Sequence, residues 1–143
     1  MEINRCNDIE KLQNFLCKID KRLPVALTSR VNINEYAIKV IERGIVLCVE
    51  HATGIIGAIL FYANDYNNKQ AYLTLIATLE EYENIGVGHC LMSAMEKVVK
   101  DEGLKTIHLD TDVSNKKAIE FYYKNGYHID RVDEKVHMIK ELL

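Results

Sequence analysis

The sequence predicts a mixed α/β (α+β) fold, in which one sheet of six or seven strands carries about four helices on its two faces. Apolar residues recur at helical spacing in two segments before residue 44, and three β-branched runs follow between residues 45 and 79. A strand, a glycine turn, a helix and another strand come next. The β runs favour an antiparallel meander, and the strand–helix–strand succession favours a right-handed parallel crossover.

The first 44 residues contain two predicted helices. In residues 8–20 the apolar side chains are spaced as on one helix face, and Asp8 is a suitable N-cap. The only proline, Pro24, marks an irregular stretch, which a second helix at about residues 34–43 follows. Residues 3–5 predict a short edge strand.

The predicted meander consists of residues 45–50, 55–63 and 71–79, each rich in β-branched and apolar side chains. The turn-like sequences HATG and NDYNNK separate these strands. After the glycines, apolar residues at i, i+3, i+4 and i+7 predict a helix from about Val87 that ends at Gly103.

The last third of the chain predicts a strand, a short helix and a β-hairpin: residues 106–113, a helix ending at Lys124, and residues 127–132 and 135–142. Ser114 or Asn115 suits the N-cap of the helix, and Gly126 suits its end. The last strand is apolar enough to pair across the edge of a dimer, so a homodimer is open.

Composition and charge limit the classes of function. The chain has 143 residues and a formal net charge of −3, which favours one domain over residues 1–143 and argues against nucleic acid as the main partner. A charged N-terminus and the lack of an apolar run of about 18 residues argue against a signal peptide and a membrane span. We therefore expect a cytoplasmic protein.

Neither the cysteines nor the histidines predict a metal site. The four cysteines lack C-x-x-C or metal spacing, and we expect buried, reduced thiols at Cys6, Cys17, Cys48 and Cys90. Four histidines are too dispersed to form a site, and we expect surface or structural roles for His51, His89, His128 and His137.

Two of the seven glycines, Gly86 and Gly88, stand in YENIGVGHCLM, at the start of an apolar helix. A tight turn there directs unpaired amides outward, and the helix dipole adds about half a positive charge. This geometry binds an anion such as a pyrophosphate. The segment is neither a P-loop, because no G-K-[ST] follows, nor a dinucleotide fingerprint, because Leu91 replaces the third glycine. A plain turn is the alternative.

A second segment, NKKAIEFYYKNGY, places Asn115, Ala118, Tyr122 and Gly126 at spacings that suit one short helix. Together the two segments resemble the GNAT superfamily of acyl-CoA N-acyltransferases. In that family an (R/Q)-x-x-G-x-G/A loop cradles the coenzyme A pyrophosphate, and an N-x-x-A-x-x-x-Y-x-x-x-G-(F/Y) helix flanks the pantetheine arm. Tyr127 completes the second match, and the order of elements agrees from about residue 45 onward.

The resemblance implies a three-layer sandwich that transfers an acetyl group from acetyl-CoA to a primary amine of a small molecule, directly and within a ternary complex. It implies an acyl-CoA-binding core at residues 45–143 and variable acceptor-side helices at residues 1–44, and we expect no metal from the cysteine and histidine spacing. Tyr122 is expected to give a proton to the departing thiolate. A backbone amide around Ile76 or Ala77, in the strand predicted at residues 71–79, is expected to meet the oxyanion. The coenzyme-binding residues it implies are Ile76, Ala77, Thr78, Asn84, Ile85, Gly86, Val87, Gly88, His89, Asn115, Ala118 and Tyr122.

The chain departs from the family pattern at Glu83, where the family has Arg or Gln. A carboxylate beside a pyrophosphate is unfavourable, by about 1 kcal/mol or less per pair in solvent. Backbone amides must therefore supply the binding of the pyrophosphate. Three lysines on the short helix are either partners of the phosphates or a solvated face: Lys116, Lys117 and Lys124. The general base is not assigned, and the nearby possibilities are Tyr72, Thr74, His108, Asp110, Asp112 and ordered water.

Two other functions stay open. Acetylation of a protein N-terminus or lysine needs an open groove, whereas the segment KRLPVALTSRV is suited to close over a small acceptor. In that segment Arg22 and Arg30 are candidates to hold an acceptor carboxylate or phosphate. From another class, a non-catalytic acyl-CoA-binding module is favoured by Glu83 and by the missing base.

Overall fold

The computed structural model describes all residues, Met1–Leu143, as four α-helices and one seven-stranded mixed sheet of order β1-β2-β3-β4-β5-β7-β6. Two 3-10 turns precede α2 and α3. The elements are β1 Asn4–Arg5, α1 Ile9–Asp20, α2 Ile33–Arg43, β2 Ile45–His51, β3 Gly54–Asp65, β4 Gln70–Thr78, α3 Val87–Asp101, β5 Thr106–Asp112, α4 Lys116–Lys124, β6 His128–Val132 and β7 Lys135–Glu141. None of the helices is long and apolar enough to cross a membrane.

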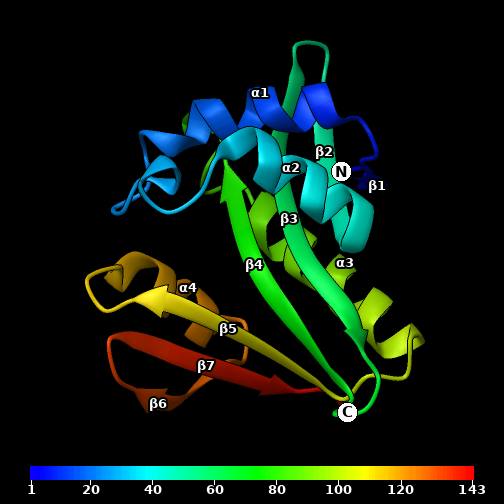
Figure 1. Cartoon of the computed structure of the whole chain (residues 1–143), viewed down its shortest axis with the longest axis vertical. Coiled ribbons are helices and arrows are strands. Elements are labelled where there is room, and N and C mark those ends of the chain that lie inside the picture. The colour runs from blue at the N-terminus through cyan, green and yellow to red at the C-terminus, as the bar shows by residue number, and fades with distance from the viewer.

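Helices cover both faces of the sheet, which confirms the predicted fold class. In Figure 1, α1 and α2 lie in front of β2 and β3. Their apolar faces, including Leu12, Phe15 and Val40, close one core of 15 buried residues. A second core of 19 buried residues joins the other face of the sheet to α3, and α4 packs against it.

Side-chain caps fix where the two N-terminal helices begin. The Asp8 carboxylate accepts a hydrogen bond from the Lys11 amide at 3.1 Å, as predicted. Asn32 accepts one from the Glu35 amide at 3.1 Å, so α2 begins at Ile33, one residue before the predicted start. A cap satisfies amides that a helix end leaves unpaired, and an asparagine at position 32 supplies this one.

The parallel crossover β4–α3–β5 confirms the predicted connection, and its two strands separate part of the way along. β5 pairs with β4 only from Gln70↔Thr106 to Leu73↔Leu109. β4 continues beside β3 as far as Thr78. In Figure 1 the two strands start together and diverge toward their ends. We call residues 74–78 of β4 and 110–112 of β5, where the ladder between them has ended, the fork.

The last strand, β7, is not an edge. It lies between β5 and β6 and pairs antiparallel with both. The prediction that residues 135–142 pair across a dimer edge is therefore wrong, because both sides of that strand are already occupied. The outer strand is β6, whose five residues are all exposed.

The cysteines are unpaired, but only two are buried. Cys6 and Cys48 lie in the core beneath α1 and α2, whereas Cys17 is exposed and Cys90 is half-buried. Cys17 differs from the prediction because the buried positions of α1 are those around it, at Leu12, Leu16 and Ile19.

Candidate active site

Six consecutive backbone N–H groups, from Asn84 to His89, donate no hydrogen bond within the protein. The preceding 3-10 turn ends when the Glu83 amide bonds to the Glu80 carbonyl, and the α3 ladder begins when the Cys90 amide bonds to the Gly86 carbonyl. The amides between have no carbonyl four residues back to use. A row of free donors at a helix N-terminus is suited to hold phosphate oxygens.

The two glycines of this loop have different reasons to be glycine. Gly86 adopts φ 91° and ψ 6°, a left-handed conformation, and a Cβ added there meets no atom within 4 Å. A Cβ at Gly88 would lie 3.1 Å from two atoms of the Phe121 ring. Gly86 therefore shapes the turn, whereas Gly88 lets the first turn of α3 pack closely against α4.

The edge of β4 that faces the fork offers further donors. The Leu79 amide bonds to the Ile56 carbonyl of β3, and Ala77 lies opposite Ala58 two positions back in the same ladder. Because bonded residues alternate in an antiparallel ladder, Ala77 also points its amide toward β3. Ile76 and Thr78 thus direct their N–H groups into the fork, and Ile76 becomes the better candidate for the predicted oxyanion contact.

Glu83 is neutralised by two cations from distant parts of the chain. Its carboxylate bonds to the Arg22 guanidinium and lies 3.2 Å from the Lys117 ammonium. Arg22 also donates to the Thr78 carbonyl. These contacts, led by the Arg22 hydrogen bond, hold the pKa of Glu83 below its usual value. Arg22 is therefore engaged by the loop rather than free to hold an acceptor, and backbone amides face a carboxylate whose charge is already compensated.

The three lysines of α4 do not act together. Lys117 pairs with Glu83 and Lys124 pairs with Glu120 of the same helix at 3.1 Å. Lys116 forms no ion pair. Two of the three lysines are thus engaged by carboxylates of the protein itself.

The short helix α4 brings Tyr122 to the core beside the loop. The Asn115 side chain accepts a hydrogen bond from the Ala118 amide at 3.2 Å, so the predicted N-cap is present. The Tyr122 ring packs edge-on against Phe121 and Tyr127, with centroids 5.7 and 6.0 Å away. Burial raises the pKa of Tyr122 to about 12, and no hydrogen bond acts on it. Because no fully buried polar side-chain atom lacks a partner, its hydroxyl reaches accessible space.

A polar cluster stands where the fork begins. The Tyr72 hydroxyl donates to the Asp110 carboxylate at 3.0 Å, and the same carboxylate contacts the His137 ring. The other ring nitrogen of His137 lies 2.9 Å from both oxygens of Asp133. Burial and Asp110 raise the pKa of Tyr72. His137, for which we expect a surface or structural role, thus contacts two carboxylates, those of Asp110 and Asp133.

Other residues considered for the general base are held elsewhere. The Thr74 hydroxyl bonds to Tyr36 of α2 at 2.8 Å, and the His108 ring lies 3.2 Å from the Thr106 hydroxyl. The Asp112 carboxylate accepts from the backbone and side chain of Ser114 at the end of β5. Among the predicted candidates, Tyr72 and Asp110 are the pair that the structure brings into contact.

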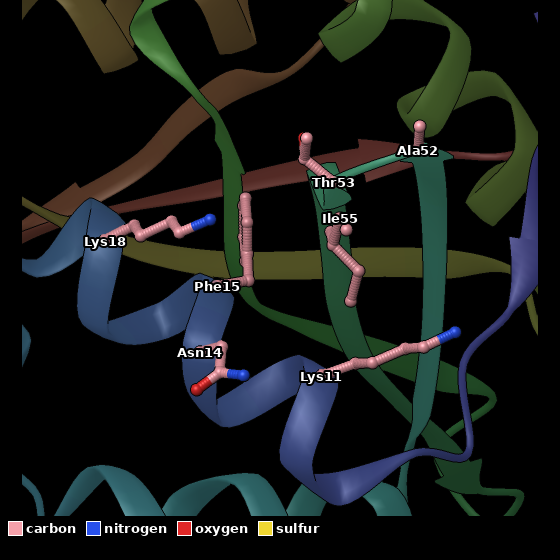
Figure 2. A pocket seen from close by; sticks show the side chains of 8 residues that line it. Lys11, Asn14, Phe15, Lys18, Ala52, Thr53 and Ile55 are labelled. Carbon is pink, nitrogen blue, oxygen red and sulfur yellow. The ribbon is translucent and has the colours of Figure 1, made fainter.

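A separate hollow of about 400 Å³ lies between α1 and the β2–β3 turn. Figure 2 shows the Phe15 ring between helix and strands, with Lys11 and Lys18 to either side. Lys11 is paired with Glu50 at 3.0 Å. The hollow shares no residue with the amide row or the polar cluster. The candidate active site is therefore the fork together with these two groups of residues, and the hollow is a separate feature.

Comparison with known proteins identifies relatives in sequence. The sequence model of the Acetyltransferase (GNAT) family matches residues 11–127. A β-lysine N(6)-acetyltransferase of Methanococcus maripaludis is 28% identical over 108 residues, 76% of this chain and 38% of that protein. An N-alpha-acetyltransferase of Sulfurisphaera tokodaii is 35% identical over 60 residues, 41% of this chain and 36% of that protein. The matches thus span less than two fifths of either relative.

Solved structures share the whole fold. The PaiA N-acetyltransferase of Thermoplasma acidophilum, in complex with coenzyme A, has a TM-score of 0.76 at 19% identity and covers 99% of this chain and 100% of its own. Ard1 of Thermoplasma volcanium has a TM-score of 0.82 at 19% identity, over 99% of this chain and 97% of its own. The family match covers most of the sequence, and the fold agrees with it. The chain belongs to the acetyltransferase (GNAT) family.

Proposed function

We propose that the protein transfers the acetyl group of acetyl-CoA to a primary amine of a small molecule, directly and within a ternary complex. The observation that carries the proposal is the fork, which has the free amides of residues 84–89 at its outer end and Tyr72 with Asp110 at its inner end. Anion-binding groups and amine-binding groups thus stand at opposite ends of one free strand edge.

Coenzyme A fits the outer end of the fork. Its pyrophosphate matches the amide row, and its pantetheine arm matches the free edge of β4, where Ile76 and Thr78 point their amides. The helix α4, where the Asn115 side chain caps the Ala118 amide, lies beside the amide row, because Phe121 packs against Gly88 and Lys117 pairs with Glu83. The thioester supplies the activated acetyl group, and we expect the Ile76 amide to donate to the oxygen on which negative charge develops.

Tyr122 is suited to donate a hydrogen bond to the leaving sulfur. A pKa of about 12 keeps its hydroxyl protonated at neutral pH. Complete transfer of that proton to a thiolate with a pKa near 8.5 is uphill by about 5 kcal/mol. A hydrogen bond that strengthens as charge grows on sulfur therefore describes its role better than full proton transfer.

The inner end of the fork is suited to receive an amine. Tyr72 gives its only hydroxyl proton to Asp110, so the lone pairs of its oxygen stay free to accept an N–H group. The Asp110 carboxylate attracts an alkylammonium, whose pKa near 10.4 means that it must lose a proton before attack. Tyr72 and Asp110 are therefore the acceptor-side residues of the proposed reaction.

A small acceptor is favoured because the segment between α1 and α2 is tied down at both ends. The Asp20 carboxylate accepts from the amide and hydroxyl of Thr28, each at 2.9 Å, and Leu27 is buried. Arg22 fastens the same segment to the end of β4. The relatives include a β-lysine N(6)-acetyltransferase and an N-alpha-acetyltransferase, so the proposal of a small acceptor rests on this segment.

A panel of acceptors with acetyl-CoA, followed by release of free thiol, tests this proposal. The panel contains small primary amines, amino acids, diamines and short peptides with free N-termini. We expect turnover with a small amine at a higher kcat/KM than with any peptide. A peptide as the best acceptor contradicts the small-molecule assignment, and tight acetyl-CoA binding without turnover on any amine favours a non-catalytic acyl-CoA-binding module.

A further inference from the structure

Asp110 and His137 are joined in a chain of hydrogen bonds that continues beyond the fork. They are direct partners in the β5–β7 register, and His137 in turn meets Asp133 in the turn before β7. Both side chains lie on the sheet face away from α3, because their chain neighbours Leu109 and Met138 belong to the core beneath that helix. The chain thus runs from Tyr72 at the fork to the β6–β7 turn.

His137 is the most enclosed member of this chain. Its side chain is 16% exposed, against 31% for Asp110 and 55% for Asp133. Each of its two ring nitrogens faces a carboxylate. A neutral imidazole carries one N–H and one lone pair, so it can satisfy one carboxylate only, whereas the imidazolium satisfies both.

The neutral ring therefore leaves one place for a proton. Asp133 presents both oxygens to Nε2, each at 2.9 Å, which favours an N–H group on that nitrogen. The lone pair on Nδ1 then faces the Asp110 carboxylate. A proton that arrives there relieves the repulsion between two acceptors and forms a charge-assisted hydrogen bond.

We propose that His137, held between Asp110 and Asp133, is the final acceptor of the proton that the amine substrate loses through Tyr72 and Asp110. This inference rests on the proposed function and names a positioning and proton-accepting pair, His137 and Asp133, that do not touch the substrate. Their effect reaches the amine only through Tyr72 and Asp110.

The proton reaches His137 in three transfers, in which every bond that breaks is matched by one that forms. The N–H bond of the ammonium breaks as an O–H bond forms on Tyr72, whose own proton passes to Asp110 Oδ2. The Asp110 carboxyl group turns about its Cβ–Cγ bond and gives this proton to Nδ1 of His137. The three groups Asp110, His137 and Asp133 go from a net charge of −2 to −1, and the amine is left neutral. The overall reaction releases one proton, which the partly exposed cluster returns to water.

The charges around His137 raise its pKa above the ordinary value of a histidine. Its pKa is raised by the hydrogen bond to Asp133 first and to Asp110 second, and Arg131, its cross-strand partner on β6, opposes them. Arg131 also pairs with Asp133 at 3.4 Å.

The charged register partners Asp112 and Lys135, on the same face, lie two positions further along β5 and β7. On β4, Tyr72 reaches His137 only through Asp110. The proton-accepting form is the neutral ring, so activity must rise as pH rises through the pKa of His137.

The first test is a proton NMR titration of the His137 ring in the full chain, with the signal assigned by its loss in His137→Gln. We expect Asp133→Asn to move the titration of His137 to lower pH, because the larger stabilising partner of the imidazolium is removed. Asp130→Asn is the matched control. It removes the same charge from the neighbouring strand, where Asp130 lies 3.9 Å from Arg131 and makes no ion pair with the ring, and we expect no comparable shift.

The second test is the pH profile of kcat with the amine found in the acceptor panel. We expect the acid limb to follow the NMR titration and to move to lower pH in Asp133→Asn. In His137→Gln, kcat falls about 10²-fold and the acid limb is lost, while the KM for acetyl-CoA stays unchanged.

The outcomes separate this inference from the proposed function. A His137 titration that does not move in Asp133→Asn, or an acid limb that persists in His137→Gln, overturns the proton-accepting role while acetyl transfer stands. Absence of turnover with every amine removes the proposed function and the role that rests on it, even where the NMR shift appears. If His137→Gln does not fold, the exposed Asp133→Asn variant still decides the question.

Discussion

Replacing Gly86 by alanine isolates the backbone turn that frees the amides of residues 84–89. Gly86 has φ 91°, and an added Cβ meets no atom within 4 Å, so the substitution introduces backbone strain without a collision. The left-handed conformation costs an alanine about 1–2 kcal/mol. At about 2–4 °C for each kcal/mol in a chain of this size, the Tm falls by about 2–8 °C.

The matched control is Gly86→Asn, because asparagine enters the left-handed region more readily than alanine does. We expect a smaller loss of Tm, measured by circular dichroism. Acetyl-CoA binding, measured by calorimetry, weakens about tenfold in the alanine variant, where the turn relaxes and the amides diverge, and less in the asparagine variant. An alanine variant with unchanged Tm and affinity, or equal losses in both variants, refutes the reasoning.

Three further results are expected. In Tyr122→Phe, kcat falls about 10²- to 10³-fold with little change in the KM for acetyl-CoA, whereas the exposed Tyr123→Phe keeps the wild-type rate in the same steady-state assay. In Glu83→Gln, the cations paired with Glu83 are released toward the phosphates, so calorimetry at low salt shows acetyl-CoA bound about threefold tighter, while Glu81→Gln leaves it unchanged. The lowered pKa of Glu83, due first to Arg22, contributes stability that is full above the unfolded pKa of about 4.3 and is lost as pH falls through the folded value. Urea unfolding between pH 3 and 6 shows a larger loss of stability in the wild type than in Glu83→Gln, where the other carboxylates with lowered pKa values still titrate, and equal losses contradict it.

Local patterns explain which parts of the molecule the sequence predicts. The free amides of the loop can be predicted from Gly86, which stands at the N-terminus of an amphipathic helix. The Asn115 cap can be predicted from a motif that spans four residues. Such features depend on neighbours in the chain. The number of strands and the parallel β4–β5 pairing are predicted for the same reason, since β-branched runs and a crossover helix determine them.

Contacts between distant residues are what the sequence does not predict. From the sequence alone, Glu83 is expected to repel the pyrophosphate. The fold brings Arg22 and Lys117 to its carboxylate from 61 and 34 positions away and compensates this charge. His137 reads as an isolated histidine because Asp110, 27 positions earlier, faces it only through the β5–β7 register. That register depends on β7 inserting between β5 and β6, and alternating hydrophobicity in a final hairpin does not say which of its strands is the inner one.

Thermal unfolding with and without acetyl-CoA tests the central claim, that the fork and its amide row bind this molecule. At a concentration of 100 times Kd, a ligand specific to the folded state adds about 2.7 kcal/mol, which raises the Tm by about 5–10 °C. We predict this shift with acetyl-CoA and none of that size with ATP or NAD at the same concentration. No shift with acetyl-CoA at millimolar concentration, or an equal shift with ATP, contradicts the claim.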